Sequence, residues 1–144
     1  MAQGFAAFYD VTRPQPSPPK IRGDTIGKAS QRKGRAGEIE LAHILQAHGY
    51  NVEPGRSQSF GEVPDLSGLP GVHIECKRVE RLNISQAMAQ AVRDAERFQD
   101  GAPAVFHRRN REPWLVTMRL EDWLDIWGSS QSPGNLAKSR KIST

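Results

Sequence analysis

The sequence predicts one α/β domain in which helices cover a small β-sheet. A chain of 144 residues has room for a single domain with a modest core. Residues 31–47 and 84–98 place apolar side chains at the spacing of amphipathic helices. Short apolar segments bounded by Gly, Pro and Ser, which are typical of strands, lie between and after these two segments. Together these elements make up one α/β domain.

The two ends of the chain differ from its middle. Residues 1–30 are Pro-rich and have little apolar periodicity, so they are predicted to form a disordered basic tail. Residues 31–127 are the predicted folded domain, and residues 128–144 are predicted to form a second disordered basic tail. Such tails either attract phosphates or are simply solvated.

The first helix is predicted over residues 31–47, with Ser30 as its N-cap and Gly49 just past its end. Its apolar stripe consists of Leu41, Ala42, Ile44 and Leu45. Glu38 lies one turn before this stripe on the same face, whereas Glu40 points roughly the other way. An acidic side chain in line with a buried stripe is costly unless it is paired. Glu38 is therefore the better candidate for a ligand.

Three strands are predicted next, at residues 50–53, 63–66 and 72–78, with a Ser-rich loop at 56–61 and a turn at 68–71.

The last two of these strands form a hairpin whose register decides where Asp65 lies. Directly paired residues share one face of a sheet, so Asp65 must lie opposite Glu75 for both carboxylates to face the same way. A two-residue loop at Leu69-Pro70 would instead pair Asp65 with Ile74. The prediction therefore requires a longer loop or a bulge.

The second half of the chain begins with a helix over residues 84–98, with Asn83 as its N-cap, which should cover the sheet. Strands are predicted at residues 102–107 and 114–118, joined by a basic turn. A short amphipathic helix follows, because apolar residues recur at i, i+3, i+4 and i+7: Leu120, Trp123, Leu124 and Trp127. The two tryptophans are expected in the core or in a dimer contact.

Glu75 and Lys77 share one face of their strand, because side chains alternate, while Val72, Ile74 and Cys76 share the apolar face. An acid followed by an acid-x-lysine triplet suits metal-dependent phosphodiester hydrolysis. Carboxylates hold one or two Mg²⁺ ions, and the ammonium positions water or stabilises the developing phosphate charge. His73 lies on the Glu75 face and is expected at a rim or partly buried, since Mg²⁺ prefers oxygen ligands.

These residues resemble the PD-(D/E)xK nuclease superfamily, and within it the archaeal-type Holliday junction resolvases and their viral relatives. The resemblance covers roughly residues 31–118. The segments that carry it are Lys33–Glu38, Leu41–Leu45, Gly49-Tyr50, Pro64–Leu66 and Ile74–Lys77. It implies a compact restriction-endonuclease-like domain with a mixed central sheet flanked by helices. It also implies a homodimer and a metal-dependent DNA endonuclease that cuts two strands of a four-way junction.

Residue by residue, the resemblance implies that Glu38, Asp65 and Glu75 are ligands of Mg²⁺, for which Mn²⁺ should substitute, and that Lys77 is the catalytic lysine. Relatives also use a serine in the loop before the Pro-Asp motif, and here both Ser57 and Ser59 are candidates.

DNA contacts are expected from polar and basic residues around the motif and in the basic turn. The candidates are Lys33, Arg35, Arg56, Ser57, Ser59, Arg78, Arg108, Arg109 and Arg111. Gln86 and Gln90 either position substrate or water or, as the simpler expectation, lie on a solvated helix face.

Two other functions stay open. The chain is either another PD-(D/E)xK nuclease of restriction, repair or flap type, or a non-catalytic nucleic-acid-binding module. The single cysteine cannot form an internal disulfide, and no apolar run approaches the roughly 20 residues that span a membrane. A cytoplasmic protein without membrane contact is therefore expected, and the resemblance implies a viral or prokaryotic context.

Overall fold

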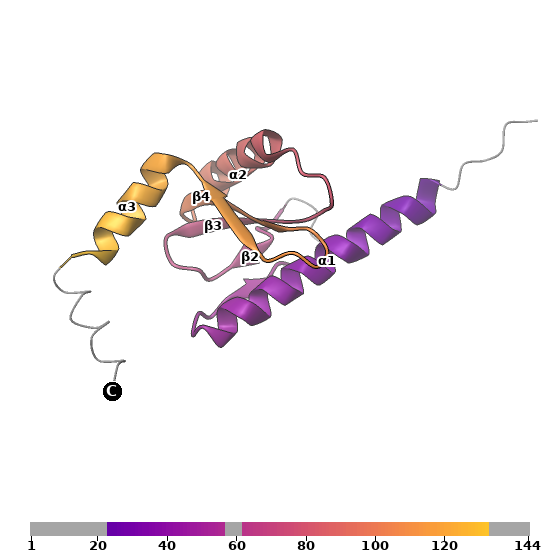
Figure 1. The fold of residues 1–144 in the computed structure, drawn as a ribbon, viewed down its shortest axis with the longest axis horizontal. Coiled ribbons are helices and arrows are strands. Elements are labelled where there is room, and N and C mark those ends of the chain that lie inside the picture. Colours follow the sequence, from indigo (N-terminus) through magenta and orange to yellow (C-terminus); the bar gives the residue numbers. More distant parts are fainter. Residues whose placement is uncertain (1–22, 57–61, 133–144) are drawn as a thin grey trace, which may run out of the picture.

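The computed structural model describes residues 23–56 and 62–132, which form an α/β fold with a five-stranded sheet (Figure 1). In chain order the elements are α1 (Gly23–Ala47), β1 (Glu53–Pro54), β2 (Leu66–Ser67), β3 (Val72–Arg78), α2 (Ile84–Phe98), β4 (Ala102–Arg108), β5 (Leu115–Met118) and α3 (Leu120–Ser130). The strands lie in the order β1-β2-β3-β4-β5. β3 and β4 are parallel, whereas the other neighbours are antiparallel. The mixed sheet flanked by helices is therefore confirmed.

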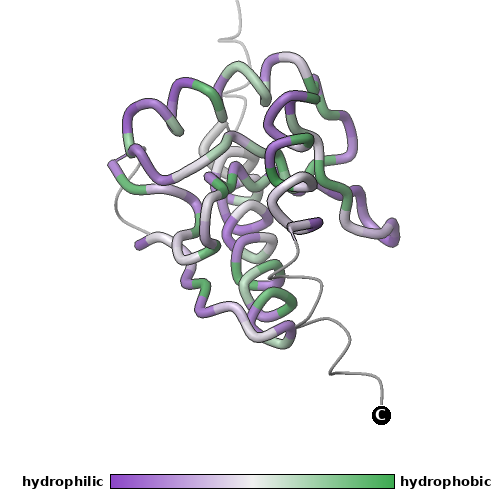
Figure 2. Tube along the Cα trace, turned by 90° about the vertical axis from the view of Figure 1, so that its left-hand side faces the viewer, coloured by the Kyte–Doolittle hydropathy of each residue, from purple (hydrophilic) through white to green (hydrophobic). Residues whose placement is uncertain are grey.

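The helices α1 and α2 cover opposite faces of the sheet (Figure 1). Ala104 and Phe106 of β4 pack in one cluster with Leu41 of α1, whereas Val105 packs in another cluster with Ala91 of α2. Because side chains alternate along a strand, these two clusters lie on different faces. Figure 2 shows hydrophilic and hydrophobic residues alternating along the helical turns, as expected for helices that bury one side.

The first helix is longer than predicted. It begins at Gly23, eight residues before the predicted start, so Ser30 lies inside the helix and is not its N-cap. No proline occurs between Pro19 and Pro54, and residues 28–36 consist mainly of good helix formers. The part of the predicted N-terminal tail from residue 23 to residue 30 is therefore helical. At the other end, α3 continues to Ser130, past the predicted boundary at residue 127.

The remainder of the two predicted tails, residues 1–22 and 133–144, lies outside the described residues.

The hairpin of β2 and β3 has the register that the site requires. Leu66 pairs with Ile74, and continuing this register by one residue places Asp65 opposite Glu75. The connection is therefore longer than the two-residue loop that would have paired Asp65 with Ile74. Gly68 follows β2 with a φ of 104°, which residues other than glycine rarely adopt. It also lies so close to the Asn51 carbonyl that a Cβ atom would not fit. The strands β1 and β2 are shorter than predicted, with two residues each.

Candidate active site

A cleft of about 540 Å³ opens at the end of the sheet where β2 meets β3. Residues from α1, from the segment before β2, from β3 and from α2 line it, and among them are all four predicted catalytic residues: Glu38, Asp65, Glu75 and Lys77. Residues that are far apart in the sequence thus meet in one place.

Glu75 and Lys77 lie together on one face of β3, as the strand alternation predicted. Glu75 is only 3% exposed, and its Oε1 atom lies 2.6 Å from Lys77 Nζ. The same ammonium donates a hydrogen bond of 3.2 Å to the Gln90 side-chain oxygen on α2. Gln90 therefore faces the cleft and orients the lysine, so the simpler expectation of a solvated helix face is wrong for this residue, whereas Gln86 is exposed.

Asp65 is tied to β3 by a backbone contact. It sits in the bend before β2, and its Oδ2 atom accepts a hydrogen bond of 2.9 Å from the Cys76 amide. Its own carbonyl accepts a 2.8 Å hydrogen bond from the Gly55 amide. These two bonds hold the Asp65 carboxylate next to β3. Cys76 itself is buried in the core, and burial raises the pKa of its thiol.

Glu38 and Glu40 of α1 have different partners. Glu38 lines the cleft, and Arg35, one turn earlier, lies 3.1 Å from its Oε2 atom. Glu40 instead lies 2.6 Å from Arg108 and 3.6 Å from Arg78, and it accepts a hydrogen bond from the Trp114 indole. Glu38 therefore lines the cleft and Glu40 does not. The prediction that Glu40 points roughly away from the buried stripe is wrong, because its carboxylate connects α1 to β3 and β4 through these ion pairs.

Burial raises the pKa of all three cleft carboxyl groups, and the Asp65 charge adds to this shift at Glu38 and Glu75. Burial raises the pKa of Glu75 to about 7, and the nearby Asp65 carboxylate adds to this shift while Lys77 opposes it. Burial raises the pKa of Asp65, although the Cys76 amide and Lys77 lower it. Burial and the Asp65 charge also raise the pKa of Glu38, against the effect of Arg35. An all-oxygen group whose negative charges repel one another suits a hard divalent cation such as Mg²⁺, so the donors fit the expected metal.

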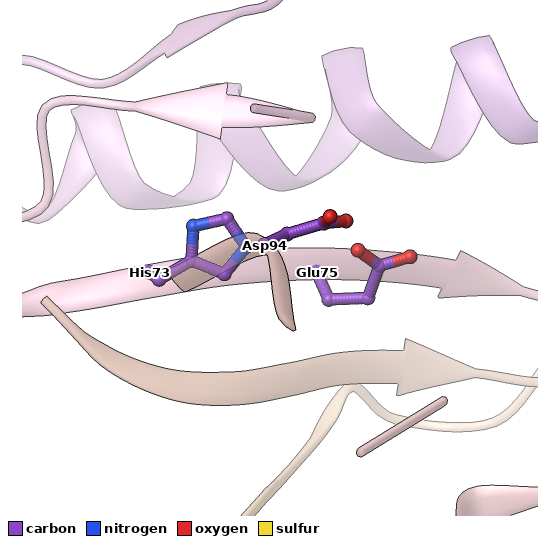
Figure 3. A group of neighbouring side chains, drawn as sticks. All are labelled: His73, Glu75 and Asp94. Carbon is purple, nitrogen blue, oxygen red and sulfur yellow. The ribbon is translucent and has the colours of Figure 1, made fainter. Parts of the chain in front are cut away.

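A second group of side chains that could bind a metal ion lies beside Glu75. His73 and Glu75 of β3 and Asp94 of α2 offer donor atoms that all lie within 4.8 Å of one another (Figure 3). His73 is 1% exposed, so the expectation of a rim or partly buried histidine is wrong. The reason is that its strand face is covered by α2, where Phe98 stacks on the imidazole with ring centres 6.1 Å apart.

The sequence analysis missed Asp94, although a signal existed. Asp94 follows the buried Ala91 by three positions and precedes the buried Ala95, so a helix over residues 84–98 places it beside the face that meets the sheet. Only the three-dimensional packing of α2 on β3 brings it next to Glu75.

Basic residues surround the acidic end of the cleft. The lining includes Lys28, Arg32, Arg35, Arg56 and Arg78. Arg35, Arg56 and Arg78 are among the residues expected to contact DNA, whereas Lys28 and Arg32 are not. Lys28 lies in the part of α1 before the predicted start of the helix, and Arg32 lies near that predicted start.

Several other predicted DNA contacts lie elsewhere. Lys33 pairs with Glu80 at 3.1 Å, and Arg108 pairs with Glu40 as described above, so both cations have acidic partners. Arg109 and Arg111 are exposed in the turn after β4. Ser57 and Ser59 lie outside the described residues.

Comparisons with models of protein families and with curated proteins found no match for this chain. No helix within the described residues is long and apolar enough to cross a membrane. The functional assignment therefore depends on the arrangement of the cleft.

The raised pKa of Glu75 predicts a pH-dependent stability in the absence of metal. In the folded protein the pKa of Glu75 is about 7, above its ordinary value of 4.5. The stability that protonated Glu75 contributes is therefore fully present below pH 4.5 and is lost as the pH rises through about 7. In chelator, we expect the free energy of unfolding measured by urea denaturation to fall by on the order of 3 kcal/mol between about pH 5 and pH 8 because of this group.

Glu75→Gln should remove most of this slope, because an amide does not titrate. Glu53→Gln, which changes an exposed carboxyl on β1, is the matched control and should keep the wild-type slope. A slope that is identical in wild type and Glu75→Gln would contradict the assignment.

Proposed function

We propose that the chain is a metal-dependent DNA endonuclease. In this proposal Glu38, Asp65 and Glu75 hold Mg²⁺, with Mn²⁺ as a substitute, and Lys77 is the catalytic lysine. The observation that carries the proposal is the cleft itself, in which three carboxyl groups of raised pKa and one lysine lie together among basic side chains. Phosphate binding needs the basic side chains, and metal binding needs the carboxylates.

Each group of side chains has a separate task in hydrolysis. The bound metal would supply Lewis-acid activation of water and neutralise charge on the phosphate. Lys77, held between Glu75 and Gln90, places an ammonium where negative charge develops. Asp65 keeps its position through the Cys76 amide and needs little reorganisation to bind a cation. Basic residues such as Lys28, Arg32 and Arg56 bind the DNA backbone on the α1 side of the cleft.

The acidic group argues against a non-catalytic binding module. Because burial raises the pKa of Glu75, its ionised form destabilises the fold near neutral pH. The ionised carboxylates would also repel the phosphates that a binding module has to attract. Metal binding explains why these carboxylates are present, whereas DNA binding alone does not.

Glu38 and Glu40 offer a matched test, because they lie on one helix and the same change can be made in both. Glu38→Gln removes a cleft carboxylate, so we expect it to reduce Mg²⁺-dependent DNA cleavage by at least about a hundredfold with little change in DNA binding. Glu40→Gln keeps an acceptor for the Trp114 indole and leaves the cleft carboxylates in place, so its cleavage rate should stay within a few-fold of wild type.

Single-turnover cleavage of a labelled four-way junction measures both rates. Circular dichroism and melting curves serve as controls, and Glu40→Gln is expected to melt at a lower temperature because it weakens two ion pairs. Equal losses of cleavage in the two folded variants would contradict the proposed site.

A four-way junction is the substrate that we propose, cut by two copies of the chain. The support comes from α3, which contributes no buried residue to the described domain. Its apolar stripe, Leu120, Trp123, Leu124 and Trp127, is between 45% and 63% exposed. Leu115 and Val116 of the edge strand β5 are also more than half exposed. Large apolar surfaces of this kind are typical of protein interfaces, and paired cuts on a symmetric junction require two active sites.

Trp127→Glu tests this dimer. Trp127 stacks on Trp123 with ring centres 5.6 Å apart, and a charge at this position should disrupt an apolar interface without disturbing the core. We expect a folded monomer by light scattering that nicks junctions one strand at a time. Asp125→Asn, a change to an exposed residue of the same helix outside the stripe, should remain dimeric. A dimeric Trp127→Glu variant or a monomeric wild type would contradict the proposed contact.

A further inference from the structure

His73 is buried, and only one of its two ring nitrogens has a hydrogen-bond partner among the described residues. Its Nδ1 atom lies 2.8 Å and 2.9 Å from the two carboxylate oxygens of Asp100. Its Nε2 atom is buried and has no hydrogen-bond partner among the described residues. A buried polar atom without a partner is costly, which suggests that something absent from the bare chain normally completes its contacts.

Asp100 determines which nitrogen can bind a ligand. A carboxylate only accepts hydrogen bonds, so Nδ1 carries the proton and donates to Asp100, and in the neutral ring Nε2 keeps a lone pair. This arrangement of carboxylate and histidine is the one that orients metal-binding histidines in general. In Figure 3 the free side of the His73 ring faces the carboxylates of Glu75 and Asp94.

The spacing of the three side chains fits one metal ion. Their donor atoms lie within 4.8 Å of one another, yet Nε2 forms no direct hydrogen bond with either carboxylate. Donors that share a divalent ion with bonds of about 2.0–2.2 Å lie roughly 3–4.3 Å apart. Small side-chain adjustments would therefore bring all three atoms to an ion between them.

We propose that His73, Glu75 and Asp94 form a second metal position, which takes a divalent transition-metal ion. The imidazole nitrogen is the reason for this choice, because Mg²⁺ strongly favours oxygen whereas transition-metal ions accept nitrogen readily. The position shares Glu75 with the proposed Mg²⁺ site and lies on its α2 side. It goes beyond the nuclease proposal, because metal binding here does not require that the chain cuts DNA.

Mn²⁺ binding to the full-length chain, measured by electron paramagnetic resonance without DNA, tests this position. The Asp65→Asn variant is the reference, because it weakens the proposed Mg²⁺ site while keeping all three side chains of the second position. We expect this variant to bind Mn²⁺ with a ¹⁴N coupling in the pulsed spectrum, which reports a directly bonded nitrogen. Adding His73→Gln should abolish the coupling.

Two further changes on α2 keep the test decisive if His73→Gln does not fold. Asp94 is half-buried, and Asp94→Asn should weaken Mn²⁺ binding at least about tenfold. Glu96→Gln, the same kind of change at an exposed position, should leave the affinity unchanged. Absence of a ¹⁴N coupling in the reference, or an unchanged affinity in Asp94→Asn, would overturn the second position. Neither result bears on DNA cleavage in Mg²⁺, so this proposal and the nuclease proposal can fail separately.

Discussion

The burial of Glu75 in the central strand is the constraint on which the rest of the site depends. Both faces of β3 are covered by helices, so a carboxylate in the middle of this strand cannot be solvated by turning outward. Its raised pKa reflects the free energy that an ionised group loses when it leaves water. Lys77, Asp65, His73 and Asp94 are all placed around this one side chain.

The placement of α1 and α2 on opposite faces of the sheet explains how the cleft combines acidic and basic side chains. α1 covers the face opposite α2, and its buried side packs on β3 and β4 through residues such as Leu41. Its N-terminal half continues past the sheet (Figure 1), where Lys28 and Arg32 line the cleft. Glu40 fixes this helix to the two central strands through Arg78 and Arg108. One helix therefore brings a carboxylate, Glu38, and a basic surface to the same place.

Local rules were sufficient for much of the fold and for bringing Glu38, Asp65, Glu75 and Lys77 to one cleft. The two-residue period of a strand predicted that Glu75 and Lys77 lie together. The pairing rule required a longer loop or a bulge before β3 if Asp65 was to face Glu75, and the observed register meets this requirement. The predicted start of α1 was wrong because the sequence of residues 23–30 contains no clear apolar stripe that a periodicity argument could detect. The burial of His73 and the closeness of Asp94 to Glu75 depend on how α2 packs across β3. The phase of the helix places Asp94 beside the face that meets the sheet, but it does not identify Glu75 as its neighbour.

The central claim is that the cleft hydrolyses DNA with the help of a divalent metal. The most direct measurement incubates the purified chain with a four-way junction, a flap and a linear duplex, in Mg²⁺ and in chelator, and resolves the products on denaturing and native gels. The account predicts paired cuts in the junction only in Mg²⁺, and a bound but uncut junction in chelator. Cleavage of the flap or the duplex alone would keep the metal site but contradict the junction as substrate. If the folded protein cuts none of the three in Mg²⁺ or Mn²⁺, the assignment of the cleft as a nuclease site is contradicted.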